Sequence, residues 1–175
     1  MSIFIFDSAP LSCFARANKL TLLEQLTSNH ERVTTRAVLE ELDEGVLAYP
    51  SLRDVHALGW LRVEAVDGLP ELRLFAEYAR VLGSGRHNIG EATVLAWAEA
   101  HGGIVFTDDE VAVNTGRRRG VEVKRTLALV ASGVKRGLLP ELEAQTLADE
   151  LVIAGARFPF KPGAFVAWAK GQGLL

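Results

Sequence analysis

The chain has 175 residues, of which 49% are hydrophobic and 23% are charged, and its formal net charge is −3. These values are typical of one soluble globular domain and give no general indication of nucleic-acid binding. A single cysteine excludes an intrachain disulfide. The apolar runs are shorter than the roughly 18 residues of a membrane span, and the N-terminus lacks a signal-peptide pattern, so we expect a cytoplasmic protein without a membrane segment.

Hydrophobic periodicity predicts strands that alternate with helices along most of the chain. In chain order we expect a buried strand at 3–6, a helix over 9–28 with a break at 16–18, a strand at 32–35, and helices at 37–48 and 52–58. An edge strand at 60–66, a helix at 70–81, a loop at 83–88, a helix at 90–100 and a buried strand at 103–107 follow. The remainder is a helix at 109–118, a strand at 121–123, and helices at 126–135, 140–154 and 164–170.

Alternating strands and helices imply a mostly parallel sheet with helices on both faces. We therefore predict a three-layer α/β/α fold with about five strands and additional C-terminal helices. We divide the chain into a main domain at residues 1–139 and appended helices at 140–175 that pack on it.

Four carboxylates lie at or near the ends of these elements: Asp7, Glu41, Glu91 and Asp109. Asp7 and Asp109 follow strands whose carboxyl ends should share one edge of the sheet, which is the ligand-binding edge of parallel folds. Glu91 is expected near the start of a helix, and Glu41 in the middle of one. Clustered anions repel one another, so a converged group would favour a divalent cation that prefers oxygen ligands, such as Mg²⁺ or Mn²⁺.

The order of four short motifs resembles the PIN-domain nucleases over about residues 3–139. The motifs are Ile5-Phe6-Asp7-Ser8, Val38-Leu39-Glu40-Glu41-Leu42, Ile89-Gly90-Glu91-Ala92 and Val105-Phe106-Thr107-Asp108-Asp109. The resemblance implies a Mg²⁺- or Mn²⁺-dependent endoribonuclease that hydrolyses RNA phosphodiester bonds. Its acidic quartet would be Asp7, Glu41, Glu91 and Asp109.

The same resemblance implies separate roles for these residues. Asp7, Glu91 and Asp109 would bind the metal, with Asp108 as the alternate for Asp109, and Glu41 would hold a metal-bound water or a second ion. Ser8 and Thr107 would orient the carboxylates by hydrogen bonds. From position alone, Arg86 and Arg117 are expected to contact substrate phosphate, whereas the basic cluster around Arg117 also fits a solvated helix end.

Other chemistries have weaker support. The histidines lack a paired zinc-binding spacing, and Cys13 lies among apolar residues without a partner base. The three tryptophans are dispersed and are more typical of core or interface positions than of a base-stacking surface. A phosphatase of the haloacid-dehalogenase type would need Asp-x-Asp, whereas the chain has Asp7-Ser8-Ala9.

The resemblance also implies a biological role. A small PIN protein of this kind is similar to VapC-like toxins, in a longer form, because residues 60–86 add a strand and a helix and further helices follow residue 140. We expect RNA as substrate, an antitoxin as protein partner, and possible homodimer formation. The alternative is a non-catalytic PIN-fold module that binds RNA or protein.

Overall fold

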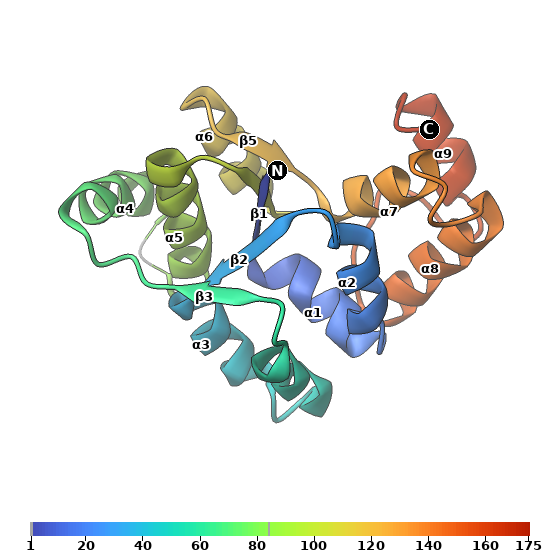
Figure 1. Ribbon diagram of the computed structural model, residues 1–175, viewed down its shortest axis with the longest axis horizontal. Coiled ribbons are helices and arrows are strands. Elements are labelled where there is room, and N and C mark those ends of the chain that lie inside the picture. The colour runs from blue at the N-terminus through green and yellow to red at the C-terminus, as the bar shows by residue number, and fades with distance from the viewer. Residues whose placement is uncertain (1, 84) are drawn as a thin grey trace.

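The computed structural model describes residues 2–83 and 85–175, without the side chains of Arg86 and His87 (Figure 1). Its five described strands form one parallel sheet in the order β3-β2-β1-β4-β5. The strands are β1 Ile3–Phe6, β2 Glu31–Thr35, β3 Arg62–Glu64, β4 Ile104–Phe106 and β5 Glu122–Lys124. The predicted fold class and strand number are confirmed.

The central strand β1 has neighbours on both sides. Ile5 is opposite Val33 of β2 and Val105 of β4, and all three side chains are fully buried. Such continuous apolar strands are typical of a parallel sheet covered on both faces, where alternation with polar residues would leave polar groups in the core. Because the chain runs from β1 outward to β3 on one side and through β4 to β5 on the other, the order reverses between β1 and β4. This is the position at which parallel folds bind ligands.

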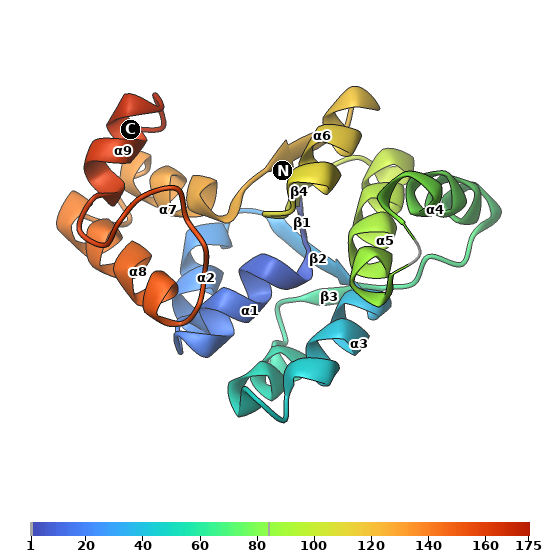
Figure 2. The same cartoon turned by 180° about the vertical axis from the view of Figure 1, so that it is seen from behind.

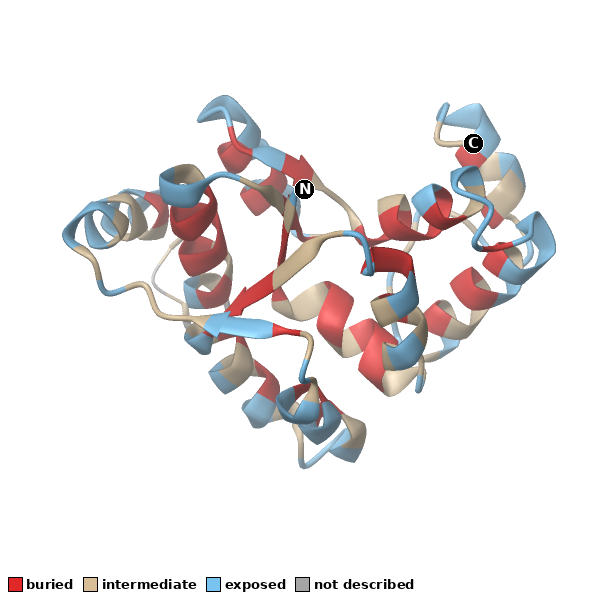
Figure 3. Cartoon of the chain, viewed as in Figure 1, coloured by how far each residue is buried: buried red, intermediate tan, exposed pale blue. Residues whose placement is uncertain are grey.

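Helices cover both faces of the sheet (Figures 1 and 2). On one side lie α3 Arg36–Gly45, α4 Leu69–Leu82, α5 Arg86–His101 and α6 Glu110–Arg118. On the other lie α1 Ser8–Arg16, α2 Leu20–Thr27 and α7 Thr126–Lys135, and the short 3-10 helix η1 Pro50–Ala57 packs against α1 and α3. Buried residues concentrate on the inner strands and on the helix faces that meet them, whereas the edge strand β3 is mostly exposed (Figure 3). No helix in the described ranges has the length and apolar composition to cross a bilayer.

The C-terminal helices pack outside α7. Helix α8 Glu141–Ile153 contacts α7 and α1, and α9 Phe165–Gly171 contacts α8. Between them, residues 154–164 form an irregular connection that carries Phe158 and Phe160. Phe165 is fully buried, with its ring centroid 5.8 Å from that of Phe160, so the aromatic side chains hold α9 against the connection.

The start of α5 differs from the sequence prediction. Residues 86–88 were expected in a loop, but α5 begins at Arg86, with Gly85 in an extended conformation as its N-cap. The Asn88 side chain donates a hydrogen bond of 2.7 Å to the Leu82 carbonyl and so joins the end of α4 to the start of α5. Glu91 therefore lies beyond the first helical turn, where the helix dipole stabilises an anion less than at the N-terminus.

Candidate metal centre

Two neighbouring strands deliver Asp7 and Thr107 side by side. The hydrogen-bond pattern of the sheet continues one residue past the strand ends, because the Asp7 N–H donates to the Phe106 carbonyl at 3.1 Å. The Thr107 hydroxyl in turn donates to Asp7 Oδ2 at 2.7 Å, and both residues are buried. One oxygen of Asp7 is therefore held in a fixed orientation, and the other is left for a further partner.

Two helices bring glutamates to the same place. One carboxylate oxygen from each of Asp7, Glu41 and Glu91 lies within 4.8 Å of the other two. Glu41 comes from the middle of α3, and its Oε1 accepts a hydrogen bond of 2.9 Å from the hydroxyl of Ser8, the first residue of α1. We call Asp7, Glu41 and Glu91 the carboxylate cluster.

Gly90 allows α5 to approach the carboxylate cluster closely. A Cβ atom at this position would lie 2.5 Å from Glu41 Oε2 and 3.5 Å from Asp7 Oδ1, so any larger residue would displace the Glu41 carboxylate. The helix is also held to β2, because the Thr93 hydroxyl donates to the Gly90 carbonyl at 2.7 Å and lies 2.7 Å from the hydroxyl of Thr35. Glu91 is recognisable in the sequence as a candidate site residue, whereas the need for a glycine before it follows only from this close approach.

Each member of the carboxylate cluster has one buried oxygen without a hydrogen-bond donor among the described residues, namely Asp7 Oδ1, Glu41 Oε2 and Glu91 Oε2. Burial raises the pKa of Asp7 to about 6, against the effect of the Thr107 hydrogen bond. Burial and then the charge of Asp7 raise the pKa of Glu41 to about 7 and that of Glu91 to about 8. Neighbouring buried carboxylates that lack hydrogen-bond donors are destabilising when they are ionised. The carboxylate cluster therefore needs a positive charge nearby to be fully ionised.

These observations fit a divalent cation. Three carboxylates supply only oxygen ligands, which suits Mg²⁺ or Mn²⁺ and disfavours softer metals that select sulfur or imidazole. The unpaired oxygens belong to the three side chains that converge, while the opposite oxygens of Asp7 and Glu41 are occupied by hydroxyl donors. Thr107 and Ser8 thus fix the orientation of the Asp7 and Glu41 carboxylates, which is the arrangement that outer-shell partners have in metal sites.

The two aspartates after β4 have different environments. Both carboxylate oxygens of Asp108 accept hydrogen bonds from Thr126, one from its N–H at 2.9 Å and one from its hydroxyl at 2.7 Å, at the start of α7. Asp109 is exposed, and its Oδ1 caps α6 by accepting from the Ala112 N–H at 2.7 Å. Asp109 lies outside the group of described carboxylates that approach within 4.8 Å. Its charge nevertheless contributes, after burial and Asp7, to the raised pKa of Glu91.

Comparison with known proteins identifies the fold family. A family model described as a PIN domain matches residues 3–161. The chain belongs to the PIN-domain family. PIN domains are generally metal-dependent nucleases that use divalent ions, in agreement with the oxygen-only carboxylate cluster. The matched region includes α8 and ends before α9. A search of curated proteins finds none that matches the chain significantly.

The basic residues expected at the substrate surface of this PIN domain are described only in part. The side chain of Arg86 lies outside the described residues. Arg117 donates from Nε and Nη2 to the Val123 carbonyl, at 3.4 and 3.1 Å, and it lines a pocket on the C-terminal side of the molecule. Its neighbour Arg119 pairs with Glu77 and Glu99, which assigns that arginine a structural role between helices.

Cys13 has the inert environment expected from its apolar neighbours. It is 6% exposed, its thiol donates to the Pro10 carbonyl at 3.4 Å, and burial raises its pKa. A thiol kept protonated is a poor nucleophile. Cys13 is therefore not a candidate nucleophile, and the carboxylate cluster is the candidate site for chemistry in this PIN domain.

Proposed function

We propose that this PIN domain is a divalent-metal-dependent endoribonuclease and that Asp7, Glu41 and Glu91 bind the metal. One observation carries the proposal: three carboxylates approach within 4.8 Å of one another, and each of them has a buried oxygen that lacks a hydrogen-bond donor among the described residues. A structural role alone would favour pairing each oxygen with a donor, since a buried unpaired carboxylate is destabilising. When bound, a divalent ion lowers the pKa of water and offsets negative charge on a phosphodiester.

Thr107, Ser8 and Asp109 would have separate roles in this reaction. Thr107 occupies Oδ2 of Asp7 and leaves Oδ1 for the metal, and Ser8 occupies Oε1 of Glu41 and leaves Oε2. Asp109 would be the fourth acidic residue of the site, because it is exposed and only its Oδ1 is used to cap α6. Asp108 is less suited to that role because Thr126 occupies both of its oxygens.

The test compares RNA cleavage by the wild type, Asp7→Asn and Asp54→Asn in Mg²⁺ or Mn²⁺. Asp54 is an exposed residue of η1 and serves as the matched control. We expect Asp7→Asn to lose cleavage while remaining folded, and Asp54→Asn to keep it. Cleavage that persists in Asp7→Asn, or that is unaffected by EDTA, would contradict the proposal. Metal binding by a wild type that cuts no RNA would favour the alternative of a non-catalytic RNA- or protein-interaction module.

The biological part of the proposal is a cytoplasmic, homodimeric toxin of the VapC-like kind that is controlled by an antitoxin. Its support is the PIN-domain match together with the acidic cluster, which offers a cationic partner segment a binding position. Induced expression in a bacterial host should arrest growth in the wild type and not in Asp7→Asn. Equal growth of both strains at equal protein levels would contradict the toxin role and leave the nuclease proposal intact.

A further inference from the structure

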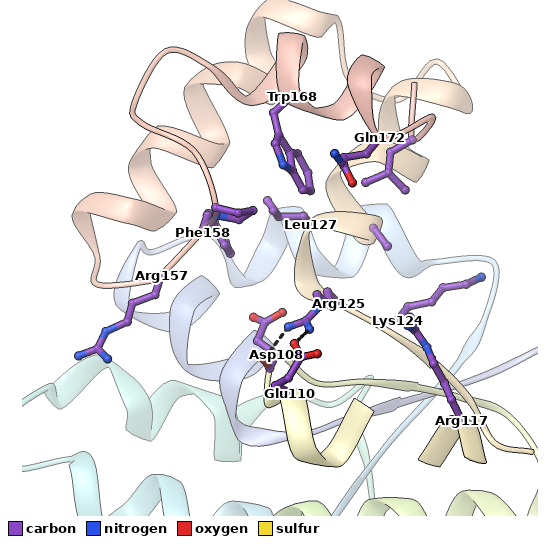
Figure 4. A pocket seen from close by; sticks show the side chains of 13 residues that line it. Asp108, Glu110, Arg117, Lys124, Arg125, Leu127, Arg157, Phe158, Trp168 and Gln172 are labelled. Carbon is purple, nitrogen blue, oxygen red and sulfur yellow. Dashed lines mark hydrogen bonds and ion pairs between the residues drawn. The ribbon is translucent and has the colours of Figure 1, made fainter. Parts of the chain in front are cut away.

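A pocket of about 740 Å³ lies beside Asp108, between the sheet domain and the C-terminal helices (Figure 4). This volume is within the roughly 300–1,000 Å³ usual for small-molecule sites. One wall comes from α6, β5 and α7 and includes Arg117, Lys124 and Leu127. The facing wall comes from α9 and the connection before it and includes Trp168 and Phe158.

The pocket wall carries more positive than negative charge. Four cationic side chains line it, against two carboxylates. Arg157 is exposed and makes no hydrogen bond, ion pair or ring contact with any residue in the described ranges. Arg117 bonds a backbone carbonyl, and the ion pair of Lys124 with Glu122 is exposed on both sides and therefore weak. Of the two acids, Glu110 pairs with Arg125, and Asp108 accepts two hydrogen bonds from Thr126. The surface can therefore receive an anion.

An aromatic side chain faces this charge. The indole of Trp168 points from α9 into the pocket toward Leu127 (Figure 4). It is only half-buried, and its ring centroid lies 5.2 Å from that of Phe160, a residue of the preceding connection, which packs against it. A supported indole with an accessible part, next to cations, is the combination that binds single-stranded nucleic acids by base stacking and phosphate contacts.

The pocket wall is adjacent in sequence to residues of the carboxylate cluster and its support. Asp108, in its wall, directly follows Thr107, which hydrogen-bonds Asp7. A second hollow of about 280 Å³ shares Asp108 and Arg157 with the pocket and reaches Ala9, two residues after Asp7. Both hollows therefore lie on the side of the molecule where Asp108 and Ala9 flank the elements that carry Asp7 and Thr107.

We propose that this pocket is a nucleotide-binding subsite for single-stranded RNA, in which a base stacks on Trp168 and Arg157 holds a backbone phosphate. The inference rests on the proposed ribonuclease function for its ligand. The pocket lies only partly within the matched PIN region, because Arg157 falls inside residues 3–161 whereas α9 and Trp168 lie beyond residue 161. The additional C-terminal helix would then position substrate for the cluster.

The experiment measures binding of a fluorescently labelled oligouridylate to the full chain by anisotropy over a series of salt concentrations. Every protein carries Asp7→Asn so that binding is measured without cleavage. The variants are Trp168→Leu, Trp168→Phe and Arg157→Gln, with circular dichroism as the folding check. Arg73→Gln is the matched control, since Arg73 is exposed on α4, at the far end of the molecule from α9 (Figure 1).

We expect Trp168→Leu to weaken binding about tenfold and Trp168→Phe to restore most of it, as stacking requires. Arg157→Gln should weaken binding and reduce the slope of log affinity against log salt by about 0.7, the value for one phosphate contact on a single strand. Arg73→Gln should leave affinity and slope unchanged. The inference is overturned if Trp168→Leu and Arg157→Gln bind like Arg73→Gln, or if the parent protein binds no oligonucleotide.

Failure of this inference can be told apart from failure of the proposed function. RNA cleavage by the chain with wild-type Asp7, together with unchanged binding in the pocket variants, overturns the subsite and keeps the nuclease. Binding through the pocket without any cleavage by the wild type keeps the subsite and overturns the nuclease.

Discussion

Replacing Asp7 with asparagine should stabilise the metal-free protein while removing its metal binding. Asp7 is 1% exposed, Thr107 donates to its Oδ2, and one oxygen of its carboxylate lies within 4.8 Å of oxygens of Glu41 and Glu91. An asparagine can still accept the Thr107 hydrogen bond through its carbonyl oxygen. Its NH₂ group would replace Oδ1, which accepts no hydrogen bond from the described residues, and this group can donate to a glutamate carboxylate. The substitution thus removes a buried charge and adds a donor where the cluster has none.

The expected size follows from the raised pKa of Asp7. The change from its ordinary value of 3.8 to about 6 corresponds to roughly 3 kcal/mol against ionisation in the folded state, at about 1.4 kcal/mol for each factor of ten. This penalty is present in full at neutral pH, where both the folded and the unfolded forms of Asp7 are ionised. Since the amide must also fit the site, we expect a gain of about 1–3 kcal/mol in the free energy of unfolding.

The assay is urea denaturation in EDTA near neutral pH, followed by tryptophan fluorescence, for the wild type, Asp7→Asn and the exposed control Asp54→Asn. A second series contains Mn²⁺. A ligand at a hundred times its Kd should stabilise the wild type by about 2.7 kcal/mol, and Asp7→Asn by much less. The reasoning is refuted if Asp7→Asn is less stable than the wild type in EDTA, or if Mn²⁺ stabilises both proteins equally.

Three further predictions follow from the same geometry. In EDTA, the raised pKa values of Asp7, Glu41 and Glu91 mean that the contribution of these carboxyl groups to stability is largest near pH 4 and falls as the pH rises toward about 8, and Mg²⁺ should reverse this loss. Denaturation series at each pH compare the wild type with Asp7→Asn, and a wild type that gains stability relative to Asp7→Asn over this range without metal would contradict the prediction. Gly90→Ala should displace the Glu41 carboxylate and weaken Mn²⁺ binding, measured by calorimetry, by roughly tenfold or more. Gly171→Ala is the control and should leave Mn²⁺ binding unchanged, because a Cβ atom there has no neighbour within 4 Å. Thr107→Val should weaken metal binding by about 10–100-fold and Thr107→Ser should restore it; equal affinities would show that the hydroxyl does not orient Asp7.

The fold was predictable from the sequence because buried parallel strands are short, apolar and separated by helices. Residues 3–6 and 104–106 have few alternative structures, and the structure agrees with those predictions. The start of α5 was not predictable in this way, because Gly83 and Gly85 are typical of loops. The Asn88 side chain and the packing of α5 against α4 favour the helix, and neither is visible in local sequence.

The sequence predicts the positions of those candidate site residues that directly follow a strand. Asp7 needs only the end of β1 and its neighbour β4 to be placed. Glu41 is different, because its approach depends on the rotation of α3, the Ser8 hydrogen bond and the absence of a Cβ at Gly90. Trp168 was interpreted as a core or interface residue, and its position in the pocket depends on how α9 packs, which is a long-range property.

Asp108 and Asp109 show how adjacent acids with equal local propensity acquire different roles. Either could cap the following helix, so sequence alone leaves the metal assignment between them open. Thr126 breaks the equivalence, because its N–H and hydroxyl bind both oxygens of Asp108 and fix that residue to the start of α7. Asp109 uses only one oxygen, on α6. The acid with a free oxygen is therefore the one available to a cation or a substrate, and the decisive residue lies on an element formed more than a dozen positions later.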